Sequence, residues 1–320
     1  MNKGIFIISL DFELMWGNIE SWTVDGYGKT HVANVRKVIL RMLELLQQWH
    51  VKATFDIVGL IMQKHGDVEI PSVVPSYTKK TLSPYENIIN NIKKKDEQLY
   101  FAPDIIDTLK SSPYVEIGTQ TYCHYYCQEE GQTLEQFDAD IEMACRVAKR
   151  RDIVLKSIVF PRNQVLKEYL AICKKYGLTS YRGNAMKFFD VPQSFFDKYK
   201  NRVFRLIDSY LNISGFTSYN IDSYEDEIMN IPASRFLRPY SRRLFFLEGL
   251  KISRIKKEMK YAARHNEIYH LWWHPHNFGG DLKKNFELVE KIFKFYKELN
   301  EEYGMQSMTM SELYSKISRL

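Results

Sequence analysis

The chain has 320 residues, of which 45% are hydrophobic and 14% aromatic, and its formal net charge is +6. This composition excludes a disordered chain, since it can bury a full core and its length suits a one-domain α/β barrel. No run of residues approaches the roughly 18 apolar residues of a membrane span, so we expect no transmembrane segment.

The chain opens with a predicted strand–helix–strand unit. Residues 4–10 form an apolar run typical of a buried strand, residues 32–49 have apolar positions at helical spacing, and residues 51–58 predict the second strand. The first run is too short for the apolar region of a signal peptide. With no export signal, the four cysteines fit reduced thiols, and we expect a cytoplasmic protein.

Residues 65–103 interrupt this alternation. They contain four prolines and a basic run at residues 93–95, which indicates an insertion that leaves the repeat. The later elements resume the alternation. Strands are predicted at residues 115–118, 155–160, 179–182, 268–273 and 306–310, and helices from residue 104 and at residues 133–149, 165–176, 248–264 and 282–303, with a less regular stretch at 203–207 and a last helix.

About seven strands alternating with helices predict a parallel sheet, and at this length its closed form is a distorted (β/α) barrel. We expect one domain over residues 1–320, with the insertion at about 65–103 and the active site at the carboxyl ends of the strands. A doubly wound open sheet is the alternative fold. No glycine-rich phosphate turn follows the first strand to support it.

Polar residues gather where the predicted strands end. Asp11 and Glu13 are two residues apart, so both side chains project to one face if the strand geometry persists. Alone, such a pair is more often a helix cap or a surface ion pair, and a lone histidine is more often semi-buried than a ligand. The other polar residues at strand ends are Gln120, His124, Arg162, Asn163, Gln164, Arg182, Asn184, Asp208, His274 and His276.

The motifs, in this order, resemble the polysaccharide deacetylase family, carbohydrate esterase family four. SLDFELMWG resembles its first motif, which implies Asp11 as catalytic base and Glu13 as a metal ligand. GTQTYCH resembles its His-x-x-x-His metal motif, with Gln120 at the first position and His124 at the second. WWHPHNFG resembles its last motif, which implies His274 as catalytic acid.

Other segments extend the resemblance toward substrate binding. KATFDIVG resembles the family's second strand, and FPRNQ resembles the motif that implies Arg162, with Asn163 beside it, as orienting the base or substrate. Asp208 falls near the motif that tunes the acid, and Trp16, Trp272 and Trp273 are candidate sugar platforms. The strings FPRNQ, SRFLRPYS and HLWWHPHNFG further resemble the branch found with bacterial surface-polysaccharide synthesis genes.

The resemblance implies a divalent metal, zinc in the first instance, which would lower the pKa of a bound water and polarise the acyl oxygen. Gln120 departs from the family pattern, since a neutral amide is a poor zinc ligand compared with imidazole. Three alternatives stay open. Water or His276 completes the ligand set, a harder metal binds weakly, or the protein has lost hydrolysis and kept carbohydrate binding.

The expected function is therefore metal-dependent N-deacetylation of an amino sugar on a surface-polysaccharide precursor, with a non-catalytic carbohydrate-binding protein as the alternative. A cytoplasmic precursor would be linked to phosphate. Residues 235–264 carry ten Lys or Arg and two Glu, a local charge of +8, with Arg238 the candidate phosphate contact. This stretch fits a solvated helix face, an anion site or peripheral contact with an acidic membrane. No nucleic-acid motif accompanies it.

Overall fold

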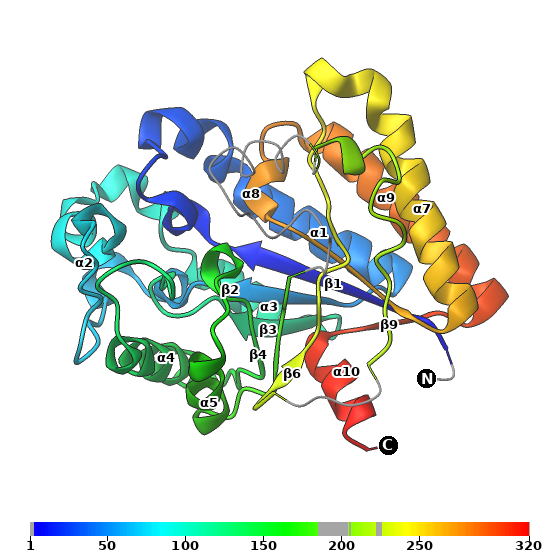
Figure 1. Cartoon of the computed structure of the whole chain (residues 1–320). Coiled ribbons are helices and arrows are strands. Elements are labelled where there is room, and N and C mark those ends of the chain that lie inside the picture. The colour runs from blue at the N-terminus through cyan, green and yellow to red at the C-terminus, as the bar shows by residue number, and fades with distance from the viewer. Residues whose placement is uncertain (1–2, 185–203, 205, 222–225, 320) are drawn as a thin grey trace.

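The computed structural model of this chain describes residues 3–184, 204, 206–221 and 226–319 (Figure 1). Its nine strands form one sheet in which every pairing of named strands is parallel. The order is β6-β5-β4-β3-β2-β1-β8-β7, and β9 pairs with β1 beside this path. The strands are β1 (Ile5–Phe12), β2 (Ala53–Ile57), β3 (Val115–Thr119), β4 (Ser157–Ile158), β5 (Ser180–Tyr181), β6 (Met229–Asn230), β7 (Arg235–Phe236), β8 (Ile268–Trp273) and β9 (Gln306–Met308).

Helices cover the outer surface of this sheet (Figure 1). The described helices are α1 (Val35–Trp49), α2 (Pro84–Asn87), α3 (Pro103–Lys110), α4 (Leu134–Lys149), α5 (Lys167–Lys175), α7 (Glu248–His265), α8 (Pro275–Phe278), α9 (Leu282–Tyr303) and α10 (Met310–Ile317). None of the helices in the described part of the chain combines the length and apolar character that a membrane span requires.

Local sequence signals set several helix ends. At the start of α4, Thr133 accepts a hydrogen bond from the backbone of Gln136, whose side chain reaches back to form a capping box. Asp281 caps α9 in the same way through the Lys284 amide. The helix ends at Gly304, whose φ of 69° lies in the left-handed region that glycine adopts without strain.

One extended segment brings the two ends of the sheet together. β6 and β7 belong to the same short stretch, residues 229–236, yet they lie at opposite ends of the strand order. The first half bonds to the β5 side, with Ile231 N donating to Tyr181 O at 2.8 Å. The second half bonds to β8, with Leu237 N donating to Trp272 O at 2.8 Å. The sheet therefore curls into a distorted barrel, which confirms the predicted fold class.

The interior of this barrel is apolar at the amino ends of the strands. Alternate residues of a strand point to opposite faces, and Ile5 and Ile7 of β1 point inward. They pack in a buried cluster with α10, through Met310, Leu313 and Ile317. The last helix thus seals the end of the barrel opposite the carboxyl ends of the strands.

The same alternation makes the carboxyl half of the interior polar. β1 continues inward with Ser9 and Asp11, β2 contributes Asp56, Arg182 follows β5, and β8 contributes His270. All five side chains are buried. The intervening residues of these strands pack against the outer helices in the main hydrophobic core. Polar side chains from strands far apart in sequence therefore meet at one end of the barrel.

Most predicted elements appear with ends shifted by a few residues. The exception is the segment of β6 and β7, for which the sequence pattern predicted no strand. In the less regular stretch predicted at residues 203–207, residues 203 and 205 lie outside the described residues, while residues 206–208 are helical. The predicted insertion at 65–103 consists of α2, the start of α3 and short 3-10 helices.

Candidate active site

The end of β1 places two carboxylates at the mouth of the barrel. Asp11 lies near the end of the strand and points inward, and Glu13 follows just after it. Glu13 is accommodated by Gly17, since a Cβ at that position would collide with Oε2 of Glu13. Both carboxylates are buried, so neither is an ordinary surface charge.

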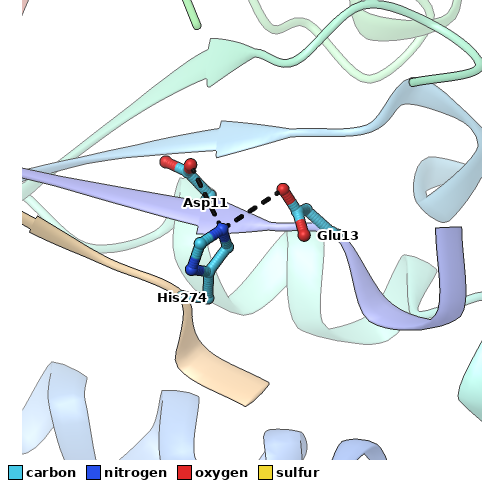
Figure 2. Close-up of side chains that lie close together, drawn as sticks. All are labelled: Asp11, Glu13 and His274. Atoms are coloured by element: carbon cyan, nitrogen blue, oxygen red, sulfur yellow. Dashed lines mark ion pairs between the residues drawn. The ribbon is translucent and has the colours of Figure 1, made fainter. Parts of the chain in front are cut away.

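His274 joins these carboxylates from the end of β8. Figure 2 shows its imidazole directed toward both, with Nε2 3.6 Å from Asp11 Oδ2 and 3.6 Å from Glu13 Oε1. One ligand atom from each residue lies within 4.8 Å of the others, a spacing that could hold a metal ion. The His274 side chain is 23% exposed, so of the three it is the most accessible to a substrate.

The loop after β3 adds two more polar groups beside Glu13. Gln120 Nε2 donates to Glu13 Oε1 at 2.8 Å, and His124 Nε2 lies 3.3 Å from the same oxygen. Burial alone would raise the pKa of Glu13, but the His274 imidazole and the hydrogen bond with His124 outweigh burial and lower it. Among the described residues, Gln120 Oε1 has no hydrogen-bond partner although it is buried. This oxygen is therefore free to accept a hydrogen bond or to act as a metal ligand next to the carboxylate.

Arg182 holds Asp11 from the opposite side. Its Nη1 and Nη2 donate to the two oxygens of Asp11 at 2.6 and 2.7 Å, the bidentate geometry that fixes a carboxylate most firmly. The guanidinium lies 4.0 Å from the centre of the Trp272 ring and also donates to Asn163 Oδ1 at 3.3 Å. The orientation of Asp11 is therefore set by Arg182.

A second carboxyl group lies beside Asp11 inside the barrel. Asp56 pairs with Asp11 in the register of β1 and β2 and is completely buried. Neither of its oxygens has a hydrogen-bond partner in the described part of the chain. Burial, and then the charge of Asp11, raise the pKa of Asp56 well above its usual value. Asp56 is therefore favoured in its protonated form, while Arg182 neutralises the negative charge of Asp11.

Residues of the short helix α8 surround His274. Asn277 Nδ2 lies 3.4 Å from His274 Nδ1 and its Oδ1 accepts a hydrogen bond from Tyr27 at 2.8 Å. With the amide donating, Nδ1 is the acceptor and Nε2 carries the proton toward the carboxylates. His276 is buried against Trp22, and burial followed by the charge of His274 lowers its pKa to about 3.

No family model matches the sequence, and no curated protein matches it either. A protein from Mycobacterium smegmatis assigned as a polysaccharide deacetylase matches the structure with a TM-score of 0.63 at 10% identity, over 100% of this chain and 92% of that one. The chain has the polysaccharide deacetylase fold. A similarity at this identity is one of fold, and the chemistry has to be argued from the site.

Two enzymes with other names are similar in fold to this chain. A GH57-type branching enzyme from Pyrococcus horikoshii matches with a TM-score of 0.55 at 11% identity, over 98% of this chain and 70% of that one. A 4-alpha-glucanotransferase from Thermococcus litoralis matches with a TM-score of 0.54 at 13% identity, over 99% of this chain and 41% of that one. The fold therefore occurs among enzymes of different carbohydrate chemistry.

Within this fold, Arg182 and not Arg162 contacts the base candidate. Arg162, expected to orient the base or the substrate, pairs with Glu20 and Glu129 and lies over the ring of Tyr126, 4.2 Å from its centre. The reason is local: Pro161 starts a 3-10 helix directly after β4, which directs the next side chain to the rim. Arg162 still borders the site, since the Tyr126 hydroxyl is 3.1 Å from His124 Nδ1.

Two of the three candidate tryptophans are buried in the structure. Trp16 is buried and donates through Nε1 to Tyr100 O, and Trp273 is buried with its ring stacked on Phe278. Neither ring is open to a sugar in this conformation. The third candidate platform, Trp272, is turned toward the site by strand alternation, with its ring centre 5.4 Å from that of His274.

Asp208 lies outside the site as well. It accepts hydrogen bonds from Arg235 Nη1 at 3.4 Å and Arg254 Nη2 at 3.0 Å, in a buried ion network with Glu258 of α7. This network joins β7 to its covering helix, and the ion pairs of Asp208 are made with its arginines. Arg238 donates to Ser209 Oγ at 2.8 Å and is half-buried.

Replacing Gln120 with histidine should raise affinity for zinc or cobalt, by roughly the 10–100-fold range in which partners of a metal site act. The amide already contacts Glu13 Oε1 at 2.8 Å, so an imidazole there would add a nitrogen donor beside Glu13 and His124. Isothermal titration of each metal into the purified protein measures the change. The control is Gln128→His, on an exposed residue of the same loop. Equal affinities in the two variants would contradict a metal centre at Gln120.

The buried histidine of β8 should make stability depend on pH. Burial, and then the charge of Arg182, lower the pKa of His270 to about 3 from an unfolded value of 6.5. The unfolded chain therefore binds the extra proton first, and stability is lost as pH falls through this interval, by about 1.4 kcal/mol per pH unit. The free energies of unfolding of the wild type and His270→Gln, measured with urea, should therefore approach each other as the pH is lowered from about 6 to about 4. The control is His265→Gln at an exposed residue, and parallel pH profiles for the wild type and His270→Gln would contradict the prediction.

Proposed function

We propose that this protein is a metal-dependent N-deacetylase, a carbon–nitrogen hydrolase acting on an amino sugar of a surface-polysaccharide precursor. One observation carries the proposal: a carboxylate fixed by a bidentate arginine, Asp11, lies 3.6 Å from a partly exposed imidazole, His274. A base and an acid on one edge of a barrel suit the two proton transfers of amide hydrolysis. The polysaccharide deacetylase fold is compatible with this chemistry.

The proton transfers can be assigned to atoms of these two residues. Asp11, oriented by Arg182, would take the proton of the attacking water. His274, oriented by Asn277 through Nδ1, would deliver the proton on Nε2 to the leaving amine. The leaving nitrogen then departs as a free amino group and the acyl group as acetate. Removal of the acyl group therefore needs no covalent intermediate with the protein.

Glu13 is the central ligand of the metal site that we propose. Its Oε1 lies within 3.3 Å of His124 Nε2 and 3.6 Å of His274 Nε2, and Gln120 has an unpaired oxygen beside it. A mixed set of carboxylate and imidazole donors suits zinc and its neighbours. A bound divalent ion would supply an acidified water and polarise the acyl oxygen. The donors that would hold it are Glu13 and His124, with Gln120 or His276 completing the set, while Asp11 and His274 serve as base and acid.

We place the protein in the cytoplasm, in peripheral contact with a membrane, where its substrate would be a phosphate-linked amino sugar. All four cysteines are free, as a reducing compartment favours. Arg238 is two residues after Phe236, whose ring centre lies 5.7 Å from that of His274, so this segment of the chain passes close to the acid candidate. Guanidinium groups bind phosphate well, which suits an anionic precursor.

The test measures acetate release from N-acetylated amino sugars, free and linked to a nucleotide diphosphate, by protein purified without chelator. We expect activity that falls with chelation and returns with zinc or cobalt, together with the metal measured in the purified protein. An α-glucan is included because a 4-alpha-glucanotransferase is similar in fold to this chain. Sugar binding without acetate release would favour the non-catalytic alternative, and cleavage of the glucan would overturn the proposal.

A further inference from the structure

Two adjacent phenylalanines are exposed where the chain enters α7. Phe245 and Phe246 belong to the 3-10 helix Arg242–Leu247, and they are 64% and 65% exposed. Leu250, about one turn further along the chain, is 45% exposed. Large apolar side chains exposed together usually mark a surface that contacts another molecule. We call Phe245, Phe246 and Leu250 the apolar tip.

A cavity continues the apolar tip along α7. It has a volume of about 360 Å³ and lies between α7 and the segment 210–216. Leu211 and Phe216 line one side, and both are exposed, to 52% and 44%. Leu250, Arg254 and Lys257 line the other side. The exposed apolar surface therefore surrounds a hollow that also contains two basic side chains.

Arg254 offers unused hydrogen-bond donors at this cavity. The residue is only 4% exposed, and its Nη2 donates to Asp208 Oδ1 at 3.0 Å. Within the part of the chain that the structure describes, its Nε and Nη1 have no hydrogen-bond partner. Buried guanidinium nitrogens normally find acceptors, so two free ones beside a cavity suit an anionic oxygen such as that of a phosphate.

Basic side chains also flank the apolar tip itself. Arg242 and Arg243 precede the phenylalanines and are exposed, and the Arg242 side chain, 86% exposed, lies 4.0 Å from Asp281. Among the acidic residues near the tip, Glu248 is paired with Lys251 at 2.7 Å and Glu287 with Lys284 at 2.9 Å. Exposed basic side chains therefore lie next to the apolar tip. Exposed apolar residues beside basic ones are typical of surfaces that bind anionic membranes.

The apolar tip lies at the same edge of the barrel as the candidate active site. The chain reaches it directly from the carboxyl end of β7, which pairs in parallel with β8, and His274 follows β8. In Figure 1 the start of α7 is the yellow segment at the top of the molecule, beyond α8. A flat surface that contacts the apolar tip would face the site edge of the barrel.

We propose that Phe245, Phe246 and Leu250 dock the protein on a membrane of anionic phospholipid, with the rings in the headgroup region and a lipid phosphate on Arg254. A second copy of this chain is the less suitable occupant, because a symmetric contact would bring the same basic residues together. Membrane docking does not depend on the proposed function. Only its purpose, to present a lipid-linked amino sugar to His274, rests on that function.

The experiment measures binding of the full chain to vesicles by sedimentation. Vesicles of phosphatidylcholine alone are compared with an equimolar mixture of phosphatidylcholine and phosphatidylglycerol. We expect binding to the anionic vesicles that weakens with added salt, since exposed charges are screened. Phe245→Ser with Phe246→Ser should weaken it at least about tenfold, and Arg242→Gln with Arg243→Gln by a similar factor. The control is Val154→Ser, at a residue 73% exposed between α4 and β4 and so at the amino end of the barrel.

Each outcome bears on docking separately from catalysis. The replaced side chains are exposed, and circular dichroism checks that every variant is folded. Equal binding by wild type and both double variants, binding to neutral vesicles as strong as to anionic ones, or no binding at all would overturn the proposal. A wild type that sediments as a dimer without vesicles, together with a phenylalanine variant that sediments as a monomer, would also overturn it. Acetate release from a water-soluble sugar should be unchanged in these variants, and its absence in the wild type would overturn the deacetylase alone.

Discussion

Replacing Asp11 with asparagine should lower acetate release by about 10²–10⁴-fold, the usual contribution of a general base. The amide is nearly the same shape as the carboxylate but cannot take the proton of a water. Initial rates at saturating metal, on a substrate that the wild type hydrolyses, measure the effect. Asp25→Asn is the matched control, because Asp25 is 86% exposed and pairs with Lys29 on the surface.

The surroundings of Asp11 also predict how this variant folds. The Arg182 guanidinium would lose an anionic partner inside the barrel, which normally costs stability. Asp56 lies beside it with a pKa that the charge of Asp11 helps to raise, so removing that charge favours ionisation of Asp56. We therefore expect a folded protein of reduced stability. Full activity of a folded Asp11→Asn variant would contradict the role of Asp11 as base.

Replacing Arg182 with methionine should destabilise the fold by about 3–5 kcal/mol, because it leaves the buried Asp11 without its partner. The matched control is Arg162→Met. That side chain is 37% exposed and its ion pairs with Glu20 and Glu129 are at the surface. We expect its replacement to cost about 1 kcal/mol or less.

Urea unfolding at neutral pH compares these two arginine variants. If Arg182→Met is too unstable to purify, Arg182→Lys retains the charge without the bidentate geometry and should fall between the wild type and the methionine variant. Equal losses of unfolding free energy at the two positions, or a larger loss at Arg162, would contradict the assignment of Arg182 as the residue that holds Asp11.

The sequence predicted the residues at strand ends better than the roles of their neighbours. Asp11, Glu13 and His274 follow strands with strong apolar patterns, and parallel strands bring their carboxyl ends to one edge. Arg182 was visible as a strand-end residue, two positions after Ser180. Only the barrel shows that this position faces Asp11, since inward orientation depends on register and not on residue type.

The positions of three other candidate residues have a common physical cause. Trp16, Trp273 and Asp208 have side chains that can either bind a ligand or complete a core, and tertiary packing decides between these roles. Trp16 and Trp273 fill space among apolar neighbours, and Asp208 neutralises buried arginines. The segment of β6 and β7 was missed because each half forms a strand of two residues, too short for a periodic pattern.

The central position of β1 has a consequence for how the protein is made. This first strand pairs with β8 on one side, and the residues that meet, Asp11 and His274, are about 260 positions apart. At the usual rate of synthesis, the ribosome needs roughly 13–50 s to reach the second after the first. Through that interval one edge of β1, apolar on both faces over residues 5–8, lacks its partner. We expect the nascent chain to aggregate readily and to depend on chaperones that bind exposed strands.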